Sequence, residues 1–315
     1  MRLKVIVNPF AGQGRARQAV MIIKRFLYKT DIEFDLEETK RAGEAVTMAA
    51  MAEQEGFDTV AVAGGDGTVA EVVKGLKDSR LGLIILPLGT INAFASSVGL
   101  VDNYVKILDG LKTTTVVEHI DLGIVKKIKD PKAKNELPGA LQESLSLMYA
   151  GAGPEVFFKQ KESKPGAKQT DDLKTYFDIG SSMIMGRMPA FSATLTDAEG
   201  NENTLSGNVV IIGNTSIHGG VLSLTPEADI SDGLLDVVIF KKSGFVDTVK
   251  AMIPLFKGEV KDGELGFTCR KATRVEIRIE EGGFEEKLFI DGTPVFKFPV
   301  EIECLAGQVS LLKMT

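Results

Sequence analysis

The sequence predicts an α/β N-terminal domain, with a parallel sheet and helices on both faces, followed by a mainly antiparallel β-sandwich. Three observations support this fold class. Short apolar runs alternate with helical patterns over residues 1–122. Beyond that point the apolar runs are strand-like, and most are separated by turns rich in glycine, proline and aspartate. The length of 315 residues is enough for roughly two domains of ordinary size.

The first domain is expected to alternate strands with helices, because short β-branched runs are typical of strands and longer spaced patterns of helices. We expect strands at residues 3–7, 32–36, 59–63 and 81–86, and helices at 16–27, 44–55, 69–76 and beyond residue 90. This alternation predicts a parallel sheet covered on both faces. Ligands of such sheets bind beyond the carboxyl ends of the strands. Asn8, Thr39, the glycines of residues 64–67 and the pair Gly89-Thr90 follow predicted strands and should meet at one edge.

The second domain reads as a series of strands with two helical interruptions, at residues 171–188 and 245–256. The strands are expected at residues 144–150, 190–195, 208–212, 235–240, 272–279, 287–290 and 300–304. A boundary near residues 121–123 gives domains at 1–122 and 123–315, and the last residues could return to the first domain.

Composition narrows the class of protein. The chain carries 37 basic and 43 acidic side chains, a formal charge of −6, which argues against binding to nucleic acid. No apolar run approaches the ~18 residues of a membrane-spanning helix, and the N-terminus shows no signal-peptide pattern. Cys269 and Cys304 are too few for a disulfide framework. These features predict a cytoplasmic protein without a transmembrane segment.

The sharpest local feature is the segment AVAGGDGTVAEVV at residues 61–73. A strand, a glycine turn and a helix start bring main-chain N–H groups and a helix dipole to one point, which suits a phosphate. The Asp66 carboxylate would repel a bare triphosphate. It fits if Mg²⁺ intervenes or if Asp66 orders the turn. A plain tight turn with Thr68 as helix N-cap is the alternative for this segment.

Two further turns follow predicted strands. In LPLGTINAFASSVG, residues 86–99, Thr90 could cap the next helix or donate to a phosphate, and Asn92 lies two residues further on. VNPFAGQGRA, residues 7–16, is a strand followed by a turn that contains glycine. Each of these two segments is explained, by itself, by a turn or a capped helix.

The combination and order of the motifs resemble the diacylglycerol kinase catalytic-domain family, which includes sphingosine and bacterial lipid kinases and is related to NAD kinase. The matching segments are NPFAG (8–12), ETKRAGEA (38–45), GGDGT (64–68), PLGTINAFA (87–95), HIDLG (119–123), PEADISDGLLD (226–236) and IDGTPV (290–295). They span most of the chain. NAD kinases share GGDGT but not NPxxG or the late DG motifs.

The resemblance implies an ATP site and a metal site. The ATP-binding positions it implies are Asn8, Pro9, Phe10, Ala11, Gly12, Thr39, Gly64, Gly65, Asp66, Gly67, Thr68, Glu71, Thr90 and Asn92. It also implies a structural Mg²⁺ loop, with the Asp232 carboxylate and the main-chain carbonyls of Asp229 and Leu234 as ligands. Oxygen ligands suit this hard cation. Without the resemblance, Asp232-Gly233 reads as an ordinary hairpin turn.

For catalysis the resemblance implies that Asp291 accepts the proton of the acceptor hydroxyl, while Asp66 and Asp121 organise Mg²⁺. A hairpin turn is again the alternative at Asp291. Two positions depart from the family pattern, because Ala93 and Thr293 stand where acidic residues are usual. Each lost charge could raise the barrier by a few kcal/mol.

We therefore expect an ATP- and Mg²⁺-dependent kinase that phosphorylates a lipid hydroxyl, as diacylglycerol kinases do, at the inner membrane surface. A catalytically impaired member that binds nucleotide or lipid is the second hypothesis, motivated by Ala93 and Thr293. NAD kinase is the third. The sequence leaves the identity of the lipid and the existence of a homodimer open.

Overall fold

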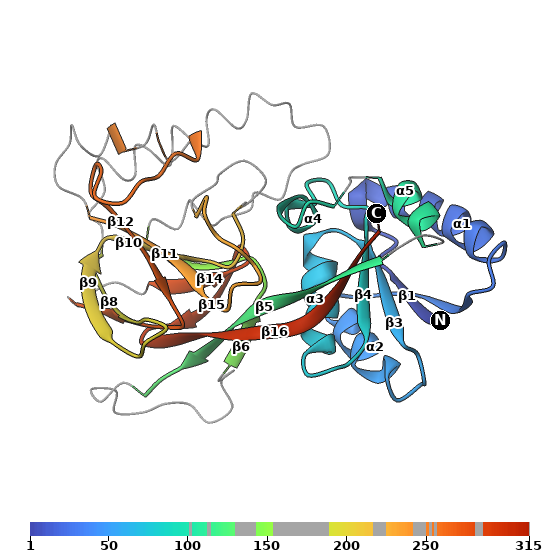
Figure 1. Ribbon diagram of the computed structural model, residues 1–315, viewed down its shortest axis with the longest axis horizontal. Helices are drawn as coiled ribbons and strands as arrows, with labels where there is room; N and C mark the ends of the chain where they lie inside the picture. Colours follow the sequence, from blue (N-terminus) through green and yellow to red (C-terminus); the bar gives the residue numbers. More distant parts are fainter. Residues whose placement is uncertain are drawn as a thin grey trace. The chain divides into compact units, whose positions relative to one another are not determined.

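The computed structural model describes residues 1–100, 103–111, 115–129, 143–153, 189–216, 225–241, 250–251, 254, 257–280 and 286–314 (Figure 1). The chain divides into two units. The first comprises Met1–Asp121 and Ala306–Thr315, and the second comprises Leu122–Leu305. No helix in these ranges has the length and apolar character needed to cross a bilayer.

A parallel sheet forms the centre of the first unit. Its strands are β1 (Arg2–Val7), β2 (Glu33–Glu38), β3 (Thr59–Gly64) and β4 (Gly82–Pro87), in the order β2-β1-β3-β4. In register, Val7 lies opposite both Glu38 and Ala63, and Gly64 lies opposite Pro87. The four strands therefore end level with one another, and the loops that follow them start from one edge of the sheet.

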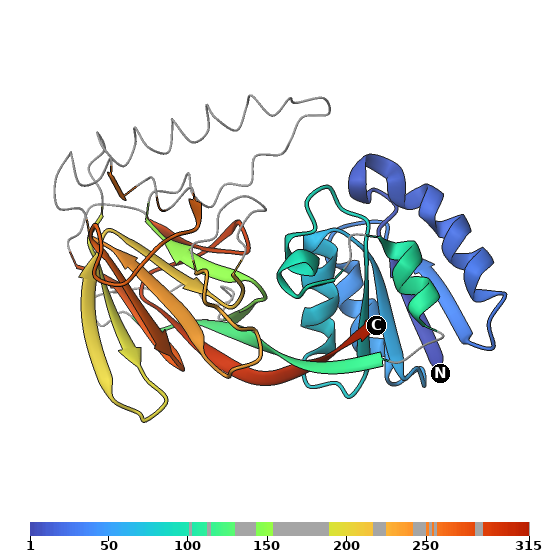
Figure 2. The ribbon, with the colours of Figure 1, turned by 45° about the horizontal axis from the view of Figure 1, so that its top comes forward.

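Helices cover both faces of this sheet, as Figure 2 shows. Helices α1 (Arg15–Leu27) and α5 (Tyr104–Gly110) bury apolar side chains against Val5 and its neighbours on one face. Helices α2 (Glu44–Ala52) and α3 (Asp66–Leu76) lie on the other face. They pack closely because α3 has no side chain at Gly75, where a Cβ atom would lie 2.3 Å from the Val46 carbonyl oxygen. A short 3-10 helix (Ala11–Gly14) and helix α4 (Ala93–Ser97) complete the unit.

The second unit is a sandwich of antiparallel strands. One sheet has the order β12-β11-β10-β7-β14-β15, and the other contains β16, β13, β8 and β9, with β5 and β6 joined to it. Buried side chains from both sheets, among them Phe191, Val210 and Val237, form one apolar core. The strands are β5 (Thr115–Lys127), β6 (Glu143–Ser146), β7 (Tyr149–Ala152), β8 (Phe191–Thr196), β9 (Glu202–Gly207), β10 (Val209–Gly213), β11 (Leu235–Phe240), β12 (Phe267–Ala272), β13 (Arg274–Ile279), β14 (Lys287–Ile290), β15 (Thr293–Lys297) and β16 (Val300–Met314).

The predicted fold class, a parallel α/β domain followed by a mainly antiparallel sandwich, is thus confirmed. Strand β16 is much longer than the predicted strand at residues 300–304. Near its start Ile302 pairs antiparallel with Val275 of the second unit, and near its end Ser310 pairs parallel with Gly82 of the first. Its paired neighbour β5 is a strand that the sequence analysis did not predict.

Two predicted strands are each broken into two. In residues 144–150 the break falls at Leu147 and Met148, whose main-chain N–H groups donate to the Asp291 carboxylate instead of continuing the sheet. In residues 272–279 the break falls at Thr273, whose N–H and hydroxyl both donate to the Thr196 carbonyl where the chain passes from one sheet to the other. The helix predicted at 171–188 lies outside the described residues, as does most of the one at 245–256.

A buried lysine anchors the edge strand β2 to the sheet. Lys4 is 4% exposed, and its ammonium lies 2.7 Å from the Asp35 carboxylate, 3.0 Å from Glu37 and 3.3 Å from Glu55. Burial lowers the pKa of Lys4, but the hydrogen bonds and charges of Asp35 and Glu37 outweigh it and raise the pKa above its usual value of 10.5. Lys4 therefore stabilises the fold fully below about pH 10.5, and this contribution is lost as the pH rises further.

Replacing Lys4 tests this role. We expect Lys4→Met to lower the free energy of unfolding by about 1–3 kcal/mol near neutral pH, because the apolar stem is kept while the partly exposed carboxylates lose their cation. Urea unfolding at neutral and strongly alkaline pH measures the difference, which should shrink at the alkaline end. Lys29→Met, at an exposed position, is the matched control. A difference that does not change with pH would contradict the electrostatic explanation.

Candidate functional site

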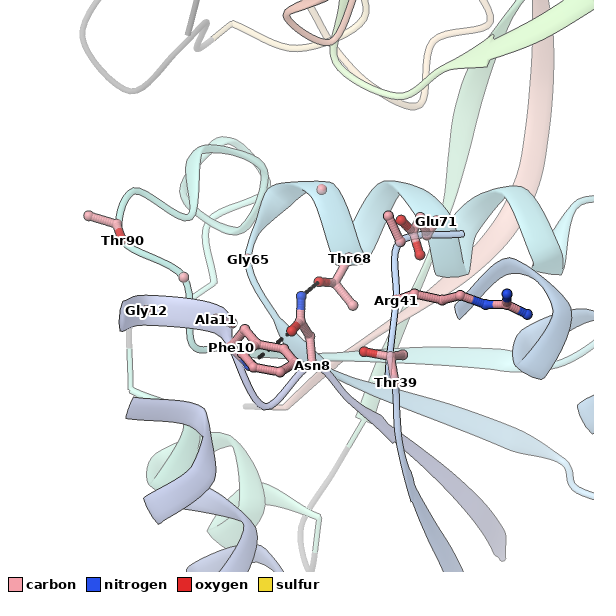
Figure 3. Close-up of a pocket in the computed structure, with 13 residues that line it drawn as sticks. Asn8, Phe10, Ala11, Gly12, Thr39, Arg41, Gly65, Thr68, Glu71 and Thr90 are labelled. Atoms are coloured by element: carbon pink, nitrogen blue, oxygen red, sulfur yellow. Dashed lines mark hydrogen bonds between the residues drawn. The ribbon is translucent and has the colours of Figure 1, made fainter. Parts of the chain in front are cut away.

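A cavity of about 420 Å³ opens at the carboxyl edge of the parallel sheet in the first unit (Figure 3). All four loops that follow the parallel strands contribute to its wall. The lining residues are Asn8, Phe10, Ala11, Gly12, Thr39, Arg41, Ala42, Gly65, Gly67, Thr68, Glu71, Gly89 and Thr90. The sequence analysis predicted ten of these positions. Gly89 was expected at the same sheet edge but not as an ATP-binding residue, and Arg41 and Ala42 were missed, although both lie in the segment ETKRAGEA.

The glycine segment forms the start of helix α3. The helix begins at Asp66 with Gly65 as its N-cap, and the Gly65 carbonyl accepts the N–H groups of Thr68 and Val69. The N–H groups of the first helical turn have no partner within a helix, so this end carries positive partial charge. Thr68 lies inside the helix, so the alternative that made it the N-cap is wrong. Its hydroxyl oxygen instead accepts a hydrogen bond from the Asn8 side chain at 3.0 Å.

Asn8 joins the first loop to this helix. Its amide nitrogen donates to Thr68, and its carbonyl oxygen accepts the Phe10 N–H at 3.0 Å, as Figure 3 shows. The Asn8 N–H also donates to the Ala63 carbonyl at 3.0 Å. One side chain and its own backbone therefore hold the turn after β1 against the end of β3.

The loops after β1, β3 and β4 approach one another so closely that their main chains are in contact. A Cβ atom at Gly89 would lie 2.5 Å from the Gly65 Cα atom, and one at Gly12 would lie 2.2 Å from the Leu88 carbonyl oxygen. Arg15 adds a polar clamp, because its guanidinium donates to the Gly12 carbonyl at 3.1 Å and to the Gly89 carbonyl at 2.9 Å. The three loops after β1, β3 and β4 are thereby held together at glycine positions.

Asn92 closes the turn after β4. It is buried, with φ at +55°, and its side chain accepts the Gly89 N–H at 2.8 Å and donates to the Gly89 carbonyl at 3.2 Å. Asn92 does not line the cavity. Asn92 therefore stabilises the turn that carries the lining residue Gly89, without contacting the cavity itself.

Asp66 orders the same turn from the other side. Its two carboxylate oxygens accept the N–H groups of Ala93 at 3.1 Å and Phe94 at 2.9 Å, at the start of α4. The sequence analysis offered ordering of the glycine turn as one explanation for this carboxylate, but its hydrogen bonds order the start of α4, after β4, instead. Pro9, Gly64 and Asp66 lie beside the cavity wall without lining it.

Glu71 secures the loop after β2. Its Oε1 atom accepts the Gly43 N–H at 2.9 Å, while Arg41 pairs with Glu44 at 3.0 Å at the rim. The Lys40 N–H donates to Glu44, and this bond, together with those from Arg41, holds the pKa of Glu44 below its usual value. Arg41 and Glu71 thus belong to the cavity wall, and Glu44, which pairs with Arg41, does not.

Neither of the other two predicted catalytic aspartates is among the residues that line this cavity. Asp121 is 1% exposed, and its Oδ1 atom accepts the Gly307 N–H at 2.7 Å in the first unit. Asp291 belongs to the second unit, with φ at +46°, and its carboxylate accepts the N–H groups that follow β6 and that start β7, all within 3.0 Å. Burial and the charge of Asp291 raise the pKa of Tyr149 above its usual range. The catalytic roles of both aspartates stay predictions.

The turn predicted to bind a structural Mg²⁺ already has a cation. Asp229 accepts the N–H and hydroxyl of Ser231, and Asp232 accepts the Leu234 N–H at 3.0 Å. The other Asp232 oxygen lies 2.6 Å from the Lys271 ammonium, which also lies 3.3 Å from Asp236. The described residues contain no group of three or more metal-binding side chains. Lys271 would compete with a divalent ion for the Asp232 carboxylate, and the Mg²⁺ loop stays a prediction.

Comparison with known proteins agrees with this architecture. Residues 2–125 match the family described as diacylglycerol kinase catalytic domain, and residues 188–313 match the YegS C-terminal NAD kinase beta sandwich-like domain. A diacylglycerol kinase of Bacillus subtilis is 26% identical over 300 residues, covering 92% of this chain and 89% of its own. A diacylglycerol kinase of Staphylococcus saprophyticus is 25% identical and covers 82% of this chain and 79% of its own.

Solved structures agree in fold. The crystal structure of a diacylglycerol kinase from Bacillus anthracis superposes with a TM-score of 0.69 at 23% identity and covers 98% of this chain and 96% of that one. Another structure from the same organism gives a TM-score of 0.71 at 25% identity, again covering 98% and 96%. Together these matches define a two-domain protein, in which a β-sandwich follows an α/β domain that matches the diacylglycerol kinase catalytic domain. The first domain matches the diacylglycerol kinase catalytic-domain family, and relatives named diacylglycerol kinase align with most of the chain.

The close contacts between the loops can be tested at two glycines. Gly12 and Gly14 both have positive φ, but a Cβ atom meets the Leu88 carbonyl at Gly12 and nothing within 4 Å at Gly14. We expect Gly14→Ala to cost about 1 kcal/mol of unfolding free energy, for its backbone alone, and Gly12→Ala about 2–4 kcal/mol. Urea unfolding of both variants measures this, and equal losses would show that the contact contributes nothing.

Proposed function

We propose that this protein transfers the γ-phosphate of ATP to the hydroxyl group of a lipid, with a diacylglycerol-like molecule as acceptor. The observation that carries the proposal is the convergence of four loops on the first turn of α3, within a chain of the diacylglycerol kinase family. The proposed location is the cytoplasm, with the acceptor met at the inner membrane surface. Phosphoryl transfer depends mainly on positioning and charge neutralisation, which such a cavity can supply.

The first turn of α3 is the proposed phosphate site. The N–H groups of Asp66 and Gly67 lead this turn, and Gly67 is exposed at the cavity. Anions bind well at such a helix start because N–H groups and the helix dipole act together. The Thr68 and Asn8 side chains form the floor beside it, and Thr39 and Thr90 provide hydroxyl groups at opposite walls.

The residues present also fit a magnesium ion carried in with the nucleotide. Mg²⁺ is usually held by one or two carboxylates together with substrate phosphates. Glu71 lines the cavity and Asp66 adjoins it, and each carboxylate oxygen can accept more than the one hydrogen bond described for it. When bound, the ion would neutralise charge on the transferred phosphoryl group. Asp291 is our proposed base for the acceptor hydroxyl, and three main-chain N–H groups fix its carboxylate in place.

A second candidate function is nucleotide or lipid binding with impaired catalysis. The observation that favours it is the loss of two acids: Ala93 presents only its N–H to Asp66, and Thr293 is an exposed residue at the start of β15.

NAD kinase is less well supported because the first domain matches the diacylglycerol kinase catalytic domain. Two measurements separate the lipid kinase from the catalytically impaired member. Calorimetry tests binding of ATP with Mg²⁺, and radiolabelled ATP then tests transfer to diacylglycerol, ceramide or phosphatidylglycerol in mixed micelles. Binding without transfer would favour the impaired member. An assay for NADP formation addresses the third.

The role of Asp66 can be tested by Asp66→Asn. We expect phosphoryl transfer to fall by a factor of about 100 or more, because one charge near the transferred group is lost. The variant should stay folded but melt a few degrees lower, because the amide oxygen accepts only one of the two N–H groups at α4 and the amide nitrogen faces the other. Asp109→Asn, at an exposed position on α5, is the matched control. Unchanged turnover in Asp66→Asn would remove this carboxylate from the mechanism.

Acidic side chains can be restored together at the two positions that depart from the family pattern, Ala93 and Thr293. If the missing acids limit catalysis, Ala93→Asp with Thr293→Glu should raise the rate of transfer at least about tenfold, which corresponds to about 1.4 kcal/mol of barrier. Initial rates at saturating ATP and acceptor measure the effect, with Ala93→Asn and Thr293→Gln as uncharged controls. An equal response to the uncharged pair would rule out an electrostatic role for these positions.

A further inference from the structure

Arg15 begins helix α1 at a position where a positive charge does not favour a helix. The first turn of α1 contains no acidic side chain, and a second arginine, Arg17, follows two residues later. The start of a helix carries positive partial charge, so an arginine there is repelled rather than attracted. The stability of α1 therefore does not explain Arg15, whereas the two main-chain carbonyls that it binds do.

One edge of the Arg15 guanidinium holds two loops of the cavity wall. Its Nε atom donates to the Gly12 carbonyl at 3.1 Å, and its Nη2 atom donates to the Gly89 carbonyl at 2.9 Å. Hydrogen bonds from a charged donor are stronger than those between neutral groups. Arg15 is not among the residues that line the cavity, so it supports the wall without forming part of it.

The Gly89 carbonyl is fixed by two donors. Besides Arg15, the Asn92 side chain donates to it at 3.2 Å, and the Asn92 side-chain oxygen accepts the Gly89 N–H at 2.8 Å. A carbonyl oxygen has two lone pairs, and both have a donor here. The peptide unit that joins Gly89 to Thr90 is therefore held in one orientation.

This orientation leaves the N–H group of Thr90 available. The peptide unit is trans, so its N–H points away from its carbonyl and hence away from Arg15. Within the part of the chain that the structure describes, neither the N–H nor the hydroxyl of Thr90 has a hydrogen-bond partner. Thr90 is also exposed and lines the cavity. A ligand in the cavity could therefore accept a hydrogen bond from it.

The Thr90 N–H belongs to the same part of the wall as the proposed phosphate site. Gly89 meets the N-cap residue of α3, because a Cβ atom at Gly89 would lie 2.5 Å from the Gly65 Cα atom. Thr90 is thus one residue away from the start of α3, where the N–H groups of Asp66 and Gly67 have no partner within the helix. Main-chain N–H groups gathered at one place bind anions well.

We propose that the Thr90 N–H is a second phosphate-binding donor and that Arg15 is the positioning residue that directs it. The chain of phosphates of a nucleoside triphosphate would accept hydrogen bonds from the first turn of α3 and from this N–H together. The inference rests on the proposed function and deepens it, since it names a further group that holds the phosphates. Binding of the phosphates is nevertheless measurable without transfer.

The test is calorimetric binding of the full chain to inorganic tripolyphosphate and to ATP, each with Mg²⁺. Arg15→Met should weaken both about tenfold, which corresponds to one charge-assisted hydrogen bond. Arg15→Lys keeps the charge but cannot donate to two carbonyls in a fixed fork, so its binding should stay at least about threefold weaker than that of the unchanged chain. Arg25→Met, at an exposed position of the same helix, is the matched control and should bind normally.

A double-mutant cycle links Arg15 to the N–H of Thr90. Thr90→Pro removes this N–H, whereas Thr90→Ala removes only the hydroxyl. We expect Arg15→Met to weaken tripolyphosphate binding by less than about twofold beside Thr90→Pro, and by the full factor of about ten beside Thr90→Ala. Equal effects beside both changes, or complete recovery of affinity in Arg15→Lys, would overturn the inference.

Binding is measured well below the melting temperature of each variant, so a loss of stability alone does not change it. If Thr90→Pro does not fold, the comparison of Arg15→Met, Arg15→Lys and Arg25→Met decides by itself. Transfer from ATP to a water-dispersed diacylglycerol is measured in parallel. If transfer occurs and Arg15→Met binds tripolyphosphate as tightly as Arg25→Met, the inference fails and the proposed function stands. If binding changes as expected but the unchanged chain transfers no phosphate, the reverse holds.

Discussion

The candidate site depends on the close approach of three loops at glycine positions. Gly65 and Gly89 are so near one another that either Cβ atom would collide with or crowd the other backbone, and Gly12 meets the Leu88 carbonyl in the same way. Because no side chain separates them, the ends of β1, β3 and β4 continue into one rigid wall. The cavity and the exposed start of α3 follow from this contact, since a bulkier residue at any of the three positions would force the loops apart.

Most polar side chains around the cavity are occupied in holding these loops. Asn8 bridges to Thr68, Asn92 closes its own turn onto Gly89, and Asp66 anchors the start of α4. Such residues position the groups that would contact a ligand, and a site built this way is organised before the ligand arrives. The main-chain amides of α3, rather than charged side chains, are therefore the part of the wall best suited to a phosphate. Asn8 and Asp66 stand in motifs shared with the diacylglycerol kinase catalytic-domain family, and in this structure their side chains support the loops.

Charge is distributed unevenly over the first unit. Acidic side chains on β2 and after α2 surround the buried Lys4, where they stabilise the edge of the sheet. Basic side chains gather on α1, where the described residues pair none of them with a carboxylate. The first arrangement has a structural reason within the fold. In the second, Arg15 has such a reason, because its guanidinium binds the Gly12 and Gly89 carbonyls and so holds the loops of the cavity wall together.

The sequence by itself determined the alternation of strands and helices, the class of both domains and ten of the thirteen residues around the cavity. These follow from local periodicity and from turn residues, which act over a few positions of the chain. The tertiary structure alone decided which atoms meet. It showed the length of β16, the break at Leu147 made by the distant Asp291, and the contact of Asp66 with a turn 27 residues away. Such pairings depend on which segments fold side by side, and a linear pattern of residue types carries no record of that.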